Sequence, residues 1–105
     1  MANFLSNLFS REGQSVLGID IGPSSIKVVQ LKKRKGRAVL ETYGALALGP
    51  YGGTEVGRAT HLPPEKIAEA LVDLLREAKT STKKCGLSIP MSSSLLVPIE
   101  VPTTD

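Results

Sequence analysis

Residues 16–33, VLGIDIGPSSIKVVQLKK, decide the fold, because they read as a strand, a tight turn and a second strand. The apolar run before the turn predicts a strand over 15–21, and the β-branched run after it predicts a strand over 25–33. Since the turn between them is short, we expect the two strands to pair as an antiparallel hairpin.

One carboxylate, Asp20, lies near the end of the first run, where burying an ionised group without a partner is costly. The turn supplies partners, because Gly22 lets a ligand approach the main chain, while Ser24 and Ser25 offer hydroxyl and amide donors. Lys27 brings a positive charge back to the same place. Together these residues predict a site for a phosphate group and its metal ion. The alternative is a surface hairpin in which Asp20 only stabilises the turn.

The composition is that of a globular protein. The chain has 105 residues, enough for one domain or part of one, with 41% hydrophobic and 22% charged residues. Aromatic residues make up only 4% and Trp is absent, so the core must be aliphatic. The net charge of +3 is too small to imply nucleic-acid binding by itself.

Several features favour a cytoplasmic protein. No apolar run approaches the ~18 residues that span a bilayer, and the N-terminus lacks the basic start of a signal peptide. Cys85 is the single cysteine, so it forms no internal disulfide, and we expect it to be a small buried hydrophobe. The segment 2–10 carries an apolar stripe at helical spacing (Phe4, Leu5, Leu8 and Phe9), which fits a membrane-touching or partner-touching helix or, as we expect, a segment that packs or frays.

Further along, the run KKRKGR at 32–37 predicts a basic turn, and a third strand is expected over 38–48. A run of this kind is typical of a solvated hairpin tip, with binding to nucleic acid or to acidic lipid as the alternative. The segment 49–62 is long, rich in glycine and aperiodic, so it is either mobile or functional. Its His61 has no second ligand at metal-binding spacing.

A helix is the clearest element of the C-terminal half. It opens at the two prolines 63–64 and carries one apolar stripe, formed by Ile67, Ala70, Leu71, Leu74, Leu75 and Ala78. A short strand follows over 85–89, and the run LLVPIEV predicts another over 95–101. The predicted order is therefore β-β-β-α-β, in which the strand after the helix lies parallel to the first strand.

This order is that of the opening half of a ribonuclease H-like fold, and the chain resembles subdomain 1A of the actin-like ATPases. The resemblance rests on DIGPSSIK at 20–27, which looks like the first phosphate loop of that superfamily. It implies that Asp20 holds the Mg²⁺ of ATP through water and that Gly22 lets the β-phosphate sit against the main chain. Ser24 and Ser25 would donate to the phosphate, and Lys27 would contact its oxygens; no catalytic residue is implied.

Further features narrow the resemblance to the FtsA/PilM branch: LGI at 17–19, IKVVQL at 26–31, KKCGLSIP at 83–90 with three serines at 92–94, and the start NFL at 3–5. It implies a cytoplasmic, nucleotide-binding scaffold of type IV pilus assembly, peripheral to the inner membrane. The implied partners are the cytoplasmic tail of PilN and other inner-membrane components of pilus assembly, with no nucleic-acid partner and with membrane contact only through a partner. An FtsA-like cell-division protein and a sugar kinase of the same superfamily are the alternatives.

The resemblance also implies a division of the chain. Residues 1–13 would be an amphipathic segment, 14–91 the first half of subdomain 1A, and 92–105 the start of a truncated subdomain 1C. The second phosphate loop and the adenosine pocket of the family lie beyond the last residue, so the chain is expected to be an inactive N-terminal fragment. The intact protein is expected to use ATP and Mg²⁺, and whether it hydrolyses ATP stays open. Pro23 departs from the family pattern and removes one amide donor.

Overall fold

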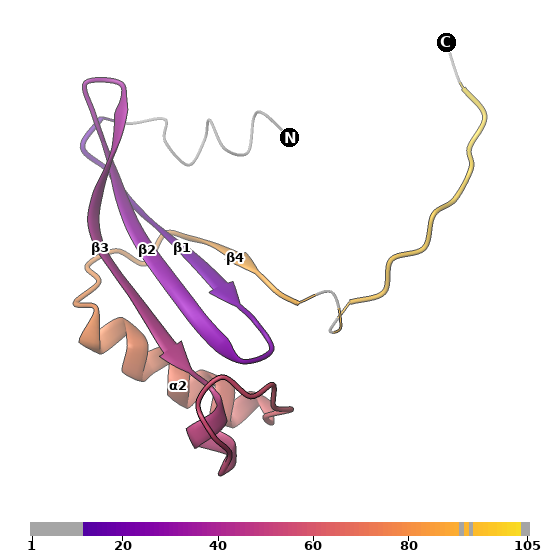
Figure 1. The fold of residues 1–105 in the computed structure, drawn as a ribbon. Coiled ribbons are helices and arrows are strands. Elements are labelled where there is room, and N and C mark those ends of the chain that lie inside the picture. The colour runs from indigo at the N-terminus through magenta and orange to yellow at the C-terminus, as the bar shows by residue number, and fades with distance from the viewer. Residues whose placement is uncertain (1–11, 91, 93, 104–105) are drawn as a thin grey trace.

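The structure is a computed structural model that describes residues 12–90, 92 and 94–103. The amphipathic stretch predicted at 2–10 lies outside the described residues. The strands are β1 (Ser15–Ile21), β2 (Ser25–Arg34), β3 (Arg37–Ala47) and β4 (Cys85–Ser88); the helices are the 3-10 turn η1 (Gly49–Gly52) and α2 (Pro64–Glu77) (Figure 1). In the described part of the chain, no helix has both the length and the apolar character needed to cross a bilayer.

The four strands form one sheet in the order β3-β2-β1-β4. β1 pairs antiparallel with β2 and β2 antiparallel with β3, whereas β4 pairs parallel with β1. Because α2 connects β3 to β4, the chain crosses over the sheet before β4 joins it, as a parallel pair requires. The α/β class and the β-β-β-α-β order predicted from the sequence are confirmed.

Both hairpins turn as the sequence indicates. At the first, Ile21 pairs with Ile26 around the four-residue turn 22–25. At the second, Lys35 and Gly36 both have positive φ angles, +49° and +73°. This is the geometry that a two-residue turn needs in order to match the twist of its strands, and Gly36 adopts it without strain.

Helix α2 covers one face of the sheet. Its stripe buries Ala70, Leu74 and Ala78 in one cluster with residues of β1 and β2, among them Ile26 and Val28. Gly44 of β3 makes the close approach possible, because a Cβ atom there would lie 2.9 Å from Leu74 Cδ1. Each large aliphatic side chain in this cluster stabilises the fold by roughly 1.5–3 kcal/mol.

The opposite face of the sheet carries no helix within the described residues (Figure 1). Strand alternation places Asp20, Lys27, Val29 and Tyr43 on this face. Val29 is 40% exposed and Tyr43 is 71% exposed. We call this surface the open face; it is where the candidate site begins.

Two expectations about the C-terminal part are wrong. No strand forms over 95–101. This segment runs away from the sheet in an extended conformation, and Leu95 is 89% and Ile99 77% exposed (Figure 1). A strand needs a neighbour for its backbone groups, and none of the described strands lies beside this segment. Cys85 is exposed rather than buried, because β4 is the edge strand and α2 packs on β2 and β3.

Candidate phosphate-binding turn

Asp20 and Lys27 are direct partners across the β1–β2 hairpin, one pair before the turn. Partners in an antiparallel pair point to the same face, with Cβ atoms about 5 Å apart. Both residues are exposed, and neither takes part in the ion pairs found within the described residues. The sequence prediction that the acid and the lysine lie together at the turn is therefore confirmed.

Asp20 is exposed, although its position near the end of an apolar run suggested that it would be buried. It lies on the open face, where water keeps the carboxylate solvated. The Ser88 hydroxyl donates to Asp20 Oδ1 at 2.5 Å, and the two residues are partners in the parallel pair β1–β4. Sequence reasoning missed Ser88; the signal was its place as the fourth residue of a strand expected to run beside β1.

The carbonyl groups of the turn 22–25 accept hydrogen bonds from backbone amides of the turn itself and of neighbouring segments. The Gly22 amide donates to the Ser25 carbonyl (2.8 Å), the Leu48 amide to the Ser24 carbonyl (2.9 Å) and the Thr60 amide to the Pro23 carbonyl (3.1 Å). All three acceptors are thus used within the protein.

The groups of the turn that remain for a ligand are donors. Neither hydroxyl of Ser24 and Ser25 has a hydrogen-bond partner among the residues that the structure describes. A Cβ atom at Gly22 would lie 3.1 Å from the Ser25 carbonyl oxygen, so a side chain there would push the turn open slightly. A tight turn that keeps its donors free and carries a lysine beside it can receive an anion.

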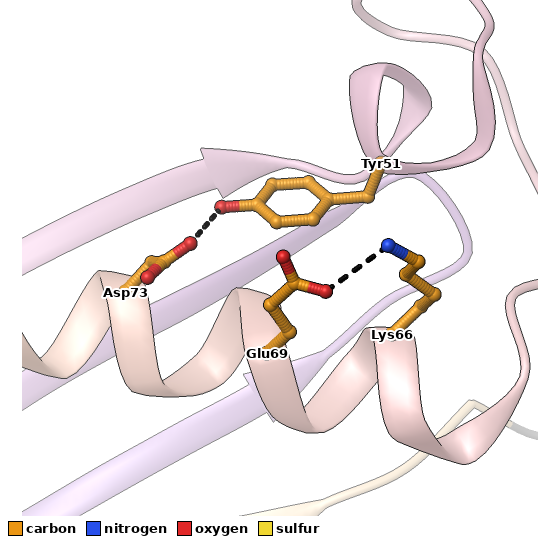
Figure 2. A network of polar contacts seen from close by, with 4 residues as sticks. All are labelled: Tyr51, Lys66, Glu69 and Asp73. Atoms are coloured by element: carbon orange, nitrogen blue, oxygen red, sulfur yellow. Dashed lines mark hydrogen bonds and ion pairs between the residues drawn. The ribbon is translucent and has the colours of Figure 1, made fainter.

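The segment 49–62 is not a free loop. Its Tyr51 hydroxyl donates to Asp73 Oδ2 of α2 at 2.6 Å, next to the exposed ion pair between Lys66 and Glu69 at 3.2 Å (Figure 2). The hydrogen bond to Asp73 raises the pKa of Tyr51 to about 12, with burial and the negative charge of Asp73 acting in the same direction. This segment is attached to the helix at Tyr51 and to the turn 22–25 at Thr60, so it supports that turn.

A pocket of about 280 Å³ lies on the other side of the turn. Its wall is largely aliphatic, with Gly22 and Pro23 at one side and Thr60, His61 and Ser92 as its polar members. Neither Asp20 nor Lys27 lines it. The pocket is therefore separate from the acid–lysine pair, although both adjoin the same turn.

The residues present fit one Mg²⁺ held indirectly, not a metal held by the protein alone. No group of three or more His, Cys, Asp or Glu ligands occurs in the described part of the chain. Mg²⁺ keeps several waters and binds through one or two carboxylates plus phosphate oxygens. Asp20 supplies one solvated carboxylate of this kind, with Oδ1 fixed by Ser88.

No family model matches this sequence. Three solved structures from Aquifex aeolicus overlap with it in part. The first, a member of the Ppx/GppA protein family, is 21% identical with a TM-score of 0.41, over 70% of this chain and 25% of that one. A PPX-GPPA enzyme (18%, TM-score 0.42) and a type II variant of a Ppx/GppA phosphatase (18%, TM-score 0.43) overlap over the same shares. The chain thus spans about a quarter of the length of these structures.

Proposed function

We propose that this chain is the nucleotide-facing N-terminal part of an actin-like scaffold protein, in which the turn 22–25 holds the phosphates of ATP. One observation carries the proposal: Asp20 and Lys27 stand side by side on one face, on the two strands that flank a tight turn whose two serine hydroxyls have no partner within the described residues. That turn follows the carboxyl end of β1, which pairs parallel with β4. In α/β sheets, ligands bind outside the carboxyl ends of such strands.

Each residue has a role that follows from its chemistry. Asp20 would hold Mg²⁺ through water, with Oδ1 of its carboxylate fixed by the Ser88 hydroxyl. Gly22 allows phosphate to approach the main chain, and Ser24 and Ser25 donate to the phosphate oxygens. Lys27 neutralises part of the phosphate charge. Pro23 contributes no amide, so the turn offers fewer main-chain donors than a glycine-rich phosphate loop.

The chain supplies one wall of such a site. The open face leaves Tyr43 and Val29 in water, and the outer edge of β4 has no neighbouring strand within the described residues. Apolar surface of this kind is normally covered. We infer that further sequence completes the fold: 14–91 are the first half of subdomain 1A, 92–105 begin subdomain 1C, and 1–13 are an appended segment.

The biological setting is inferred from the resemblance in 17–31 and 83–94. We propose a cytoplasmic component of type IV pilus assembly that reaches the inner membrane through the cytoplasmic tail of PilN. Binding of a labelled PilN tail peptide to the intact protein, followed by fluorescence anisotropy, tests this part. No binding by a protein that does bind ATP would reject the pilus assignment and keep the nucleotide site.

Calorimetry with Mg-ATP tests the nucleotide site. We expect micromolar binding by the intact protein and no measurable binding by the 105-residue chain, because one wall supplies few contacts. In the intact protein, Asp20→Asn and Lys27→Ala should each weaken binding by about tenfold or more, since each removes a charge-assisted contact. Lys83→Ala, an exposed lysine before β4, is the matched control and should leave the affinity unchanged. Unchanged affinity in both site variants would reject the assignment.

A further inference from the structure

The far end of the β2–β3 hairpin carries a dense positive charge. Five of the six residues at 32–37 are basic, and we call them the basic tip: Lys32, Lys33, Arg34, Lys35 and Arg37. None of the five takes part in an ion pair found within residues 12–90, 92 and 94–103. Arg34 and Arg37 are direct partners across the strands, an arrangement of like charges that destabilises a hairpin.

The charge of the tip is not balanced by its surroundings. Two carboxylates approach it: Glu12 accepts from the Lys35 amide, and Glu41 lies near enough to feel the charges of Lys32 and Arg34. Five positive charges less these two leave +3, which equals the net charge of the whole chain. The remaining charged residues of the chain, eight basic and eight acidic, sum to zero.

Apolar side chains are exposed directly beside these cations. Val39, the partner of Lys32, is 43% exposed, and Leu40, the partner of Leu31, is 52% exposed. No aromatic residue lies within 31–40, so the tip offers no platform on which bases could stack. Aliphatic side chains among lysines and arginines suit the boundary between lipid headgroups and acyl chains.

The N-terminal stretch joins the described fold at the same end. The Gly13 amide donates to the Lys33 carbonyl at 2.9 Å, and Glu12 contacts the turn as described above. The residues before Glu12 include the apolar set Phe4, Leu5, Leu8 and Phe9. Two weak membrane-binding signals in one protein bind far better than either alone.

We propose that the basic tip is itself a docking surface for an anionic lipid bilayer, a direct contact in addition to the one through the partner, with its cations on the headgroup phosphates and Val39 and Leu40 at the interface. The ten residues of β2 separate the tip from the phosphate turn by about 33 Å. The turn would thus face away from the membrane, and the two sites work independently.

Vesicle co-sedimentation of the full chain tests the proposal. Phosphatidylcholine vesicles with about 30% phosphatidylglycerol should bind the chain at about 0.1 M salt, and vesicles of phosphatidylcholine alone should bind much less. Each basic residue contributes about fivefold to partitioning, so Lys33→Gln with Arg34→Gln should lower it about 25-fold. The pair Arg58→Gln with Lys83→Gln removes two exposed charges elsewhere and is the matched control.

Three results would overturn the proposal: equal binding to both kinds of vesicle, an equal loss in the control pair, or no loss in the tip pair. A tighter complex with a short RNA or DNA at the same salt, followed by anisotropy, would assign the tip to nucleic acid instead. If the double variant fails to fold, Lys35→Asn replaces it, because asparagine tolerates the positive φ angle there. It should lower partitioning about fivefold.

Discussion

Asp20 of β1 and Lys27 of β2 are partners in the antiparallel register, and both side chains project from the open face of the sheet. The two side chains do not form an ion pair with each other, so Asp20 does not neutralise the charge of Lys27. Ser88 of β4 holds the carboxylate instead. This arrangement leaves one positive and one negative group available at the same turn.

The pair should contribute little to stability. Asp20→Asn and Lys27→Ala are each expected to change the free energy of unfolding by less than about 0.5 kcal/mol, since both side chains are exposed. Urea denaturation of the full chain measures this directly. A loss above about 1 kcal/mol in either variant would mean that the residues serve the hairpin rather than a ligand.

Gly44 should tolerate a branched side chain poorly. A Cβ atom there would lie 2.9 Å from Leu74 Cδ1 and 3.4 Å from Ala78 Cβ, so Gly44→Val should push α2 away from the sheet. The expected loss of stability is about 1–3 kcal/mol, as for other overpacked cores. Gly86→Val in β4 is the control, because nothing lies within 4 Å of its Cβ position. Equal effects at the two glycines would contradict the packing described.

Because of the hydrogen bond from Tyr51 to Asp73, the free energy of unfolding should decrease at alkaline pH. The folded-state pKa of Tyr51 is raised from 10.0 to about 12, so its contribution is complete below about pH 10 and is lost as the pH rises through 12. Tyr51→Phe should lower stability by about 1 kcal/mol at neutral pH. The difference between the two proteins should vanish at high pH, which urea titrations at several pH values will measure; a constant difference would argue for packing alone.

Because of Glu41, the free energy of unfolding should decrease at acidic pH. Hydrogen bonds from Ser15 and from Gln30 lower the pKa of Glu41 below its usual 4.5. A lowered folded-state pKa means that the contribution is present above about pH 4.5 and is lost as the pH falls through the folded value. Glu41→Gln should flatten the acid limb of a plot of stability against pH. An acid limb as steep as in the parent would refute the assignment.

The sequence predicts the elements that depend on local pattern. The apolar run before the turn 22–25 and the β-branched run after it predict β1 and β2, and the stripe from Ile67 to Ala78 predicts α2 with its buried face. The crossover logic then gives the parallel pairing of β4, and with it the central position of β1. These features follow from neighbours in sequence and from chain handedness.

Contacts between residues that are distant in the sequence could not be predicted from local patterns. The bond from Ser88 to Asp20 joins residues in β4 and β1, and its existence depends on the register of a four-residue strand. The attachment of Tyr51 to Asp73 depends on where a glycine-rich segment folds back, which carries no periodic signal. The exposure of Cys85 follows from which strands α2 covers, and an apolar pattern alone does not fix that.

The central claim is that the hairpin turn binds the phosphates of a nucleotide, and calorimetric titration of the intact protein with Mg-ATP tests it most directly. The account predicts micromolar binding that weakens about tenfold or more in Asp20→Asn and in Lys27→Ala. Binding of equal strength in the parent and in both variants would contradict it, as would an intact protein that binds no nucleotide.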